Sequence, residues 1–218
     1  MHKKSLKFMK RVLIYGTGLM SLALGVAFSV NSSLGVSPVN SLPFVISLVT
    51  GADMGNCVTA VFSMYILVQI LILRKEFRLI NLTQLLFTGL FGYFVDMAKW
   101  LVGDFTIQTY FGKLLMLAVS ILFVSAGVCL YMNAKLVYMP MEGMTHAIAE
   151  KMFKDKPFHD VKVLMDCLVV FLGIVLSLIF LDGVEGIREG TVICAVLVGR
   201  VMRPMQKILI PLINRSCL

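Results

Sequence analysis

The chain has 218 residues, of which 59% are hydrophobic and only 15% charged, and its formal net charge is +8. A soluble domain is nearer half apolar and a quarter charged, so this composition excludes an ordinary soluble protein and indicates an integral membrane protein. The positive charge does not indicate nucleic-acid binding, because the basic residues stand beside the long apolar runs. In that position they fix orientation and contact anionic lipid head groups.

The first stretch of the chain predicts a basic leader, one span and one short helix. Residues 1–11 carry five Lys or Arg and are expected in the cytoplasm. The apolar run 12–31 lacks a small-x-small cleavage site and more runs follow it, so it reads as an uncleaved first span. One face of this span should let another helix approach closely, because small residues recur there: Ser21, Gly25 and Ser29. The helix 38–50, which Pro38 starts, is about 20 Å long and too short to cross.

Two further runs, 56–73 and 79–101, predict the second and third spans. The third span has a polar face whose members recur every four residues: Gln84, Thr88, Gly92 and Asp96. Asp96 stands near the outer end of this span, where it can reach water or pair with Lys99 one turn away.

The second half of the chain follows the same order. Three apolar runs predict the remaining spans: 113–133, 161–181 and 190–212. A second short helix, 140–153, precedes the fifth span and carries three ionisable residues: Glu142, His146 and Glu150. Arg200 and Arg203 would be costly inside the sixth span. Either that span ends before them and they are cytoplasmic anchors, or they pair with an acid, for which we nominate Asp166 of the fifth span.

The two halves also match in sequence. A shift of 102 positions lays 25–40 on 127–142 with five identities in sixteen pairs. The identical pairs are Gly25/Gly127, Val26/Val128, Asn31/Asn133, Leu34/Leu136 and Pro38/Pro140. We interpret the chain as two membrane repeats, 12–104 and 113–213. Because each repeat has three spans, an odd number, the two must lie upside-down relative to one another.

The fold class predicted from these patterns is an all-α membrane protein with six transmembrane helices and two short re-entrant or half helices, arranged as a 3+3 inverted repeat. Six spans place 17 Lys and Arg on the cytoplasmic side and 3 outside, whereas eight spans would give 15 against 5. The charge bias therefore does not decide between the two, and the short length of the two helices favours six. Both termini, Phe77 and Phe158 are then cytoplasmic, and Thr106 and Gly186 lie outside.

Re-entrant short helices would bring their starts together near the membrane midplane. The residues predicted to line a substrate site there are Asn31, Pro38, Asn40, Asn133, Pro140 and Glu142. Two converging helix N-termini favour an anionic or carbonyl-bearing solute, although Glu142 opposes an anion unless it is protonated or paired. The alternative is structural: Asn40 and Glu142 cap their own helices, while Asn31 and Asn133 hydrogen-bond between helices.

The residues resemble the YczE/YyaS/YitT group of bacterial membrane proteins, most closely its YczE-like branch. The resemblance rests on two segments, Leu34-Gly35-Val36-Ser37-Pro38 and Gly92-Tyr93-Phe94-Val95-Asp96. The second half departs from the pattern, with Val137 where a glycine is expected and Arg203 where an uncharged or acidic residue is typical. The resemblance implies a multi-pass protein of the bacterial plasma membrane and implies no substrate.

Two function classes stay open. The first is a carrier for a small polar or anionic solute, with its site at the interface between the repeats. The second is an accessory membrane protein that stabilises or localises a partner, and a homodimer is compatible with either class. Paired catalytic acids, a nucleophile with its base, and a glycine-rich phosphate loop are all missing from the sequence, so we expect no enzyme. We also expect no cofactor and no metal, since His146 and His159 lie thirteen residues apart without other ligands.

Overall fold

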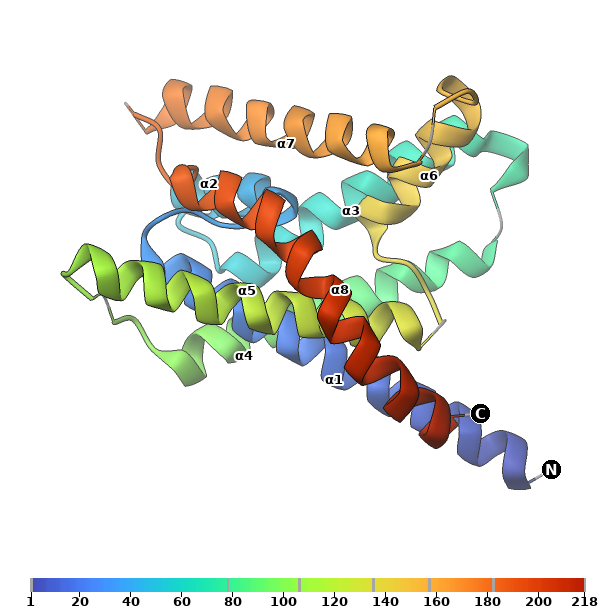
Figure 1. The fold of residues 1–218 in the computed structure, drawn as a ribbon. Coiled ribbons are helices and arrows are strands. Elements are labelled where there is room, and N and C mark those ends of the chain that lie inside the picture. Colours follow the sequence, from blue (N-terminus) through green and yellow to red (C-terminus); the bar gives the residue numbers. More distant parts are fainter. Residues whose placement is uncertain are drawn as a thin grey trace.

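Apolar runs punctuated by proline and glycine fold into a wholly helical protein. The computed structural model describes residues 2–77, 79–105, 107–134, 136–156, 158–181 and 183–217, and no strand occurs among them. For a few of these, Arg203 and His159 included, it describes the backbone only. The described residues contain these α-helices (Figure 1): α1 (His2–Ser32), α2 (Pro38–Thr50), α3 (Met54–Leu73), α4 (Thr83–Val102), α5 (Tyr110–Asn133), α6 (Pro140–Met152), α7 (Phe158–Phe180) and α8 (Glu189–Cys217). Two short 3₁₀ turns, Arg74–Glu76 and Leu79–Leu82, join α3 to α4.

Among the described residues, five helical segments are long and apolar enough to cross a membrane: Lys7–Ser32, Met54–Glu76, Thr83–Val102, Tyr110–Asn133 and Asp160–Phe180. This agrees with the predicted helical membrane protein. α8 covers the predicted sixth span but is not one of these five, and it carries Arg200, Arg203 and Lys207 in its middle. The six-span count and the 3+3 repeat therefore stay predictions.

The helix boundaries follow local sequence signals. Proline opens α2 and α6, because its fixed φ and missing N–H suit the first helical position. Gly51 ends α2 with a left-handed φ of 68°, a conformation that glycine adopts at little cost. The predicted basic leader is itself helical, since α1 begins at His2 and continues without a break into the first apolar run.

α1 and α5 cross at the centre of the molecule, where small residues let their backbones meet. A Cβ on Gly18 would lie 2.7 Å from the Tyr131 backbone nitrogen, and one on Gly25 would lie 3.0 Å from the Ser120 carbonyl oxygen. Two serine hydroxyl groups form hydrogen bonds between the two helices. Ser21 donates to the Phe123 carbonyl at 2.9 Å, and Ser120 donates to the Gly25 carbonyl at 2.7 Å. Such small-residue contacts replace the hydrophobic effect as the source of helix association in lipid.

The remaining helices pack around this crossing. α4 lies against α1 and α3, while α8 lies against α5. α2 packs on α3 and α7, and α6 packs on the same two helices. Figure 1 places α2 toward the end where α4 joins α5 and α7 joins α8, and α6 toward the opposite end, which also holds both termini.

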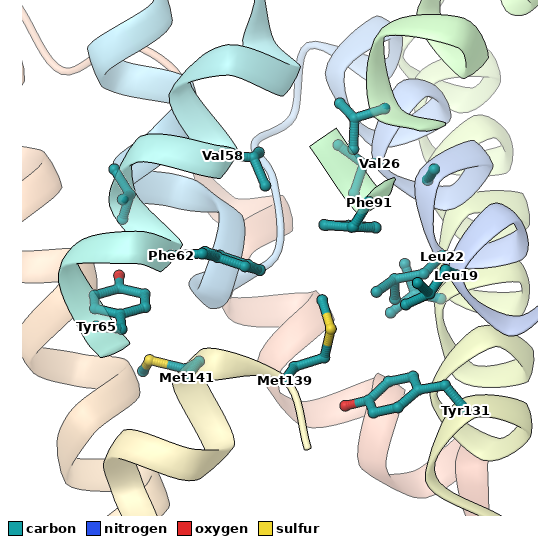
Figure 2. Close-up of a cluster of buried hydrophobic side chains, with 14 of the residues drawn as sticks. Leu19, Leu22, Val26, Val58, Phe62, Tyr65, Phe91, Tyr131, Met139 and Met141 are labelled. Atoms are coloured by element: carbon teal, nitrogen blue, oxygen red, sulfur yellow. The ribbon is translucent and has the colours of Figure 1, made fainter. Parts of the chain in front are cut away.

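The core is an apolar cluster between α1 and α3. Figure 2 shows Phe62 from α3 and Phe91 from α4 facing Leu22 of α1, with Met139 reaching in from below. Phe62 and Phe91 stack with their ring centroids 5.9 Å apart. All four side chains are buried. Met139 and Met141 thus bring the start of α6 into the interior, whereas Met152 at the other end of α6 is exposed.

Candidate functional site

The first turn of α6 holds an acid in the protein interior. Met139, the N-cap residue, has no side chain that can cap the helix, and Pro140 brings no N–H. Glu142 follows at the third helical position, and its Oε2 atom is buried without a hydrogen-bond partner among the described residues. A buried carboxylate oxygen without a partner is costly. This is therefore the residue around which we build the site.

Hydroxyl groups from α1, α3 and α5 surround the start of α6. The Tyr131 hydroxyl hydrogen-bonds to the Glu142 carboxylate. The Tyr15 ring meets the Tyr131 ring edge-on, with centroids 6.0 Å apart, and Tyr15 is only 1% exposed. The Tyr15 and Tyr65 hydroxyls are both buried and, within the described residues, lack a partner. Three phenols thus gather near one acid, with unused hydrogen-bonding capacity on several of them.

Two amides contact α6 from its other side. Gln69 of α3 donates from its Nε2 atom to Gln84 Oε1 at 3.2 Å and to the Pro140 carbonyl at 3.3 Å. Gly143 makes this approach possible, because a Cβ there would lie 2.5 Å from the Gln69 nitrogen. Both glutamines are buried. They link α3 and α4 to the start of α6 through neutral groups.

One ion pair lies on the α7 side of Glu142. Lys162 Nζ and Asp166 Oδ1 are 2.5 Å apart, one helical turn along α7, and both side chains are partly buried. Burial raises the pKa of Glu142, the positive charge of Lys162 acts in the opposite direction, and Asp166 adds to the rise. Glu142, Lys162 and Asp166 therefore form one electrostatic group.

This ion pair differs from the one predicted from the sequence. We nominated Asp166 as the partner of Arg200 or Arg203, but the structure pairs it with Lys162 on its own helix. Arg200 is exposed, and the side chain of Arg203 lies outside the described residues. The i,i+4 spacing of Lys162 and Asp166 is a sequence signal that could have identified this pair.

Asp96 also has a partner other than the one expected. Its Oδ1 atom accepts a hydrogen bond from the Gly55 backbone N–H at 2.7 Å, across the α3–α4 interface. Asp96 therefore satisfies an otherwise free donor in the first turn of α3. A Cβ on Gly55 would overlap the Gly92 carbonyl, so these glycines bring the helices close enough for the bond. The polar face of α4 is an interhelical contact, with Thr88 fully buried within it.

The start of α2 corresponds by position to the start of α6 but has different chemistry. Asn40 donates from its Nδ2 atom to the Ser37 hydroxyl at 3.0 Å, while its Oδ1 atom is buried without a partner in the described residues. Ser41 donates to the Pro38 carbonyl at 2.7 Å. These bonds are local to α2, but none of them is a side-chain cap, so the capping alternative for Asn40 stays a prediction.

The two other predicted polar residues make ordinary helix contacts. Asn31 donates to the Gly103 carbonyl at 2.6 Å and thereby ties the end of α1 to the end of α4. Asn133 donates to the Cys129 carbonyl one turn back on its own helix, at 2.7 Å. A direct meeting of Pro38 and Pro140 across a repeat axis stays a prediction.

A separate hollow lies at the end of the molecule away from both termini. Its volume is about 350 Å³, and it opens between the end of α1, α2 and the connection from α7 to α8. Polar, charged and apolar residues line it, including Ser33, Phe44, Leu48, Glu185 and Arg188. Sequence reasoning named neither this hollow nor Gln69, Tyr15, Tyr131 and Lys162. Of these, Gln69 gave the clearest signal, as an amide within an otherwise apolar span.

Comparison with known proteins identifies a family and adds no activity. The family described as a family of unknown function, DUF6198, matches residues 9–207. The chain is 23% identical to the uncharacterized protein YyaS of Bacillus subtilis (strain 168) over 209 residues, which cover 95% of this chain and 96% of that protein. This supports a relation to YyaS, while the YczE and YitT parts of the resemblance stay expectations. No solved structure matches. With the greater part of its length matched, the chain belongs to the DUF6198 family of unknown function.

Proposed function

We propose that this protein is a carrier for a small solute in the bacterial plasma membrane, with both termini in the cytoplasm. In this proposal α1–α4 and α5–α8 are two units that lie inverted in the bilayer. Each unit has three crossing helices and one half-helix, and the half-helices α2 and α6 enter from opposite faces. Many secondary transporters use this plan and bind their substrates where half-helices end.

The α1–α5 crossing supports the inverted repeat. Adding 102 to Gly18 gives Ser120, and adding 102 to Gly25 gives Gly127. Under this shift the Gly18–Gly127 contact corresponds to the Ser120–Gly25 contact, and the structure contains both. The Ser21–Phe123 contact maps onto itself, because 21 and 123 also differ by 102. A two-fold axis through this crossing would produce that pattern.

The other helix contacts support the same relation. α1 packs on α4 as α5 packs on α8, and α2 packs on α7 as α6 packs on α3. Some pairs depart from the relation, and the largest departure is that α3 lies close against α4, whereas α7 and α8 contact each other much less in the described residues. The half-helix of each unit therefore docks on a long helix of the other unit.

The observation that carries the carrier proposal is the buried Oε2 atom of Glu142 at the start of α6, for which the described residues offer no hydrogen-bond partner. Ionisable groups inside a membrane protein are costly and usually belong to a substrate or ion pathway. The groups nearby are phenols, amides and an ion pair, so they suit a small solute with hydroxyl or amine groups. An anion is disfavoured, because Glu142 places negative charge where the helix N-terminus would otherwise attract one.

A ligand screen on the purified full-length protein tests this proposal. Polyols, sugars, amines, amino acids and organic acids are each added, and the apparent unfolding temperature is measured. A native-state binder at 100 times its Kd should stabilise the protein by about 2.7 kcal/mol. Glu142→Gln should abolish the effect, whereas Glu150→Gln, two turns along α6 and exposed, should preserve it. Compounds that stabilise are then tested for uptake into proteoliposomes, and absence of both effects would contradict a carrier.

A second candidate is an accessory protein that steadies a membrane partner or a second copy of this chain. It is favoured by the apolar packing at the centre, where Phe62, Phe91 and Met139 fill the space between α1 and α3 (Figure 2). Such packing leaves little room for a water-filled path. Cysteine at position 62 separates the two functions. Reaction of this thiol with a small water-soluble reagent supports a carrier, and its complete protection supports the accessory role.

A further inference from the structure

The charges around α6 do not balance. Two carboxyl groups, Glu142 and Asp166, share one ammonium group, Lys162. Lys162 is in contact with Asp166, so among the described side chains Glu142 has no counter-charge in direct contact. A buried ionised carboxylate in this state is energetically costly. Binding a proton or a cation would remove that cost.

In the part of the chain that the structure describes, the titratable and charged groups around Glu142 come from four helices. α5 contributes Tyr131, α1 contributes Tyr15, and α7 contributes the Lys162–Asp166 pair. α3 contributes Tyr65, which is sensitive to the charge on Asp166. α4 contributes only the neutral Gln84. Counting only side chains that the structure describes, the set therefore contains a single cation, which one acid already holds.

The chemistry of these groups favours a proton over a metal ion. Metal cations need several oxygen, nitrogen or sulfur ligands, and the described residues contain no group of three or more His, Cys, Asp or Glu that could hold one. A protonated carboxyl needs only an acceptor for its O–H. The Tyr15 hydroxyl, 1% exposed and without a partner in the described residues, has free lone pairs close by.

We propose that Glu142 is a proton-binding site, with Tyr131, Tyr15 and the Lys162–Asp166 pair as its surroundings. Its role as the coupling site rests on the proposed carrier function, whereas proton binding itself does not. With Glu142 protonated, Lys162 pairs with Asp166. When Glu142 loses its proton, Lys162 is drawn toward two carboxylates at once, and the contact between α6 and α7 changes. Binding or loss of a proton would thereby change the position of the half-helix α6 relative to the spanning helix α7.

Infrared titration of the full-length protein in lipid nanodiscs, with no solute added, tests the site directly. A protonated carboxyl group has a C=O stretching band that the carboxylate lacks. Wild type should show a band that disappears with a midpoint above the ordinary glutamate value of about 4.3. Glu142→Gln should lack this band, and Glu150→Gln should keep it. A band that survives in Glu142→Gln, or a midpoint at the ordinary value, overturns the proposal.

Substitutions in the Lys162–Asp166 pair should shift the titration midpoint of Glu142 in opposite directions. A purely structural role of the pair would not produce such shifts. Asp166→Asn frees Lys162 to pair with Glu142, so the midpoint should fall by about one pH unit or more. Lys162→Gln removes the cation, so the midpoint should rise by a similar amount. Equal midpoints in the two variants and wild type would contradict the electrostatic group described above.

A chemical measurement on wild type covers the case in which Glu142→Gln does not fold. A hydrophobic carbodiimide adds to protonated carboxyl groups in apolar surroundings, and peptide mass spectrometry locates the adduct. Glu142 should react below the midpoint found in the infrared titration and become unreactive above it, while exposed Glu150 provides the internal control. Failure of Glu142 to react overturns the proton site. If Glu142 reacts but no solute in the screen stabilises the protein, the proton site is retained and the carrier function is rejected.

Discussion

α2 and α6 have the same length and the same proline start, yet their first turns differ in chemistry. Both helices contain 13 residues and bury most of their first half. In α2 the third residue, Asn40, is neutral and bonds to Ser37 one turn back. In α6 the third residue, Glu142, is ionisable and keeps one buried oxygen without a partner in the described residues. Asn40 also keeps one buried oxygen without a partner in the described residues, so the two helix starts differ in charge: only Glu142 can bind and release a proton.

The segments that lead into the two helices differ as well. Gly35 has a φ of 108°, and its neighbours bond to the start of α8: Gly190 N–H donates to the Leu34 carbonyl, and Val36 N–H donates to the Gly186 carbonyl. Before α6 the corresponding position is Val137, and Met139 enters the core through its side chain. Backbone bonds hold the first helix start, and apolar packing holds the second. We therefore expect α6 to be the half-helix that shifts more easily.

The largest expected effect is a difference in thiol labelling between the two half-helices, because α2 and α6 are proposed to enter the membrane from opposite faces. On a background without native cysteines, Leu48→Cys near the end of α2 should react with an impermeant thiol reagent added to intact cells. Met152→Cys at the end of α6 should react only after the membrane is opened. Both side chains are exposed, so accessibility within the protein does not confound the comparison. Equal labelling of both positions from one side would contradict opposite entry.

Among single substitutions at the two helix starts, Gly35→Val should be the most destabilising. A Cβ at Gly35 would lie 2.6 Å from Thr191 Oγ1 and 2.8 Å from the Arg188 backbone nitrogen, and the positive φ disfavours any branched residue. We expect a loss of about 3 kcal/mol or more in the free energy of unfolding. The control is Val137→Gly at the matching position of the second unit, where we expect about 1 kcal/mol or less. Denaturant titration in detergent measures both, and similar losses would contradict the comparison.

Sequence patterns located the helices more accurately than the partners of polar side chains. Proline at 38 and 140 predicted the starts of α2 and α6, because proline can occupy the first helical position and rarely a later one. The patterns named neither of the partners that Asp96 and Asp166 have in the structure. Asp96 accepts a bond from a backbone N–H, which no side-chain pattern reveals, and Asp166 pairs with Lys162 one turn away on its own helix. The cluster around Glu142 joins helices up to 127 positions apart, so it depends on packing that periodicity does not encode.

Removing the polar groups at the two helix starts should have different consequences. Asn40→Ala removes the bond to Ser37 and should cost about 1 kcal/mol at every pH. Glu142→Gln should change stability in a way that depends on pH. Burial raises the pKa of Glu142 in the folded protein. Its stabilising contribution is therefore complete below the unfolded value of about 4.3 and is lost as the pH rises through the folded value.

Thermal unfolding of the two variants between about pH 5 and pH 9 separates these effects. Relative to wild type, Glu142→Gln should become steadily more stable as the pH rises, whereas the deficit of Asn40→Ala should stay constant. Glu150→Gln on the exposed side of α6 controls for the removal of a surface charge. A constant difference between wild type and Glu142→Gln across this range would indicate that Glu142 does not change its protonation.

The smallest expected effect concerns the outer ends of the half-helices. At the end of α6, Lys151 Nζ pairs with Glu76 Oε1 at 2.5 Å, but Glu76 is 61% exposed. At the end of α2 the contact is apolar, since a Cβ on Gly186 would lie 2.6 Å from the Phe44 ring. Exposed ion pairs contribute about 0–1 kcal/mol, so Glu76→Gln should lower stability by less than about 1 kcal/mol, and the loss should shrink in high salt. Phe44→Ala, which removes a half-buried ring, should cost more. A larger loss for Glu76→Gln than for Phe44→Ala would mean that the Lys151–Glu76 ion pair at the exposed end of α6 holds this helix in place, in addition to its packing in the core.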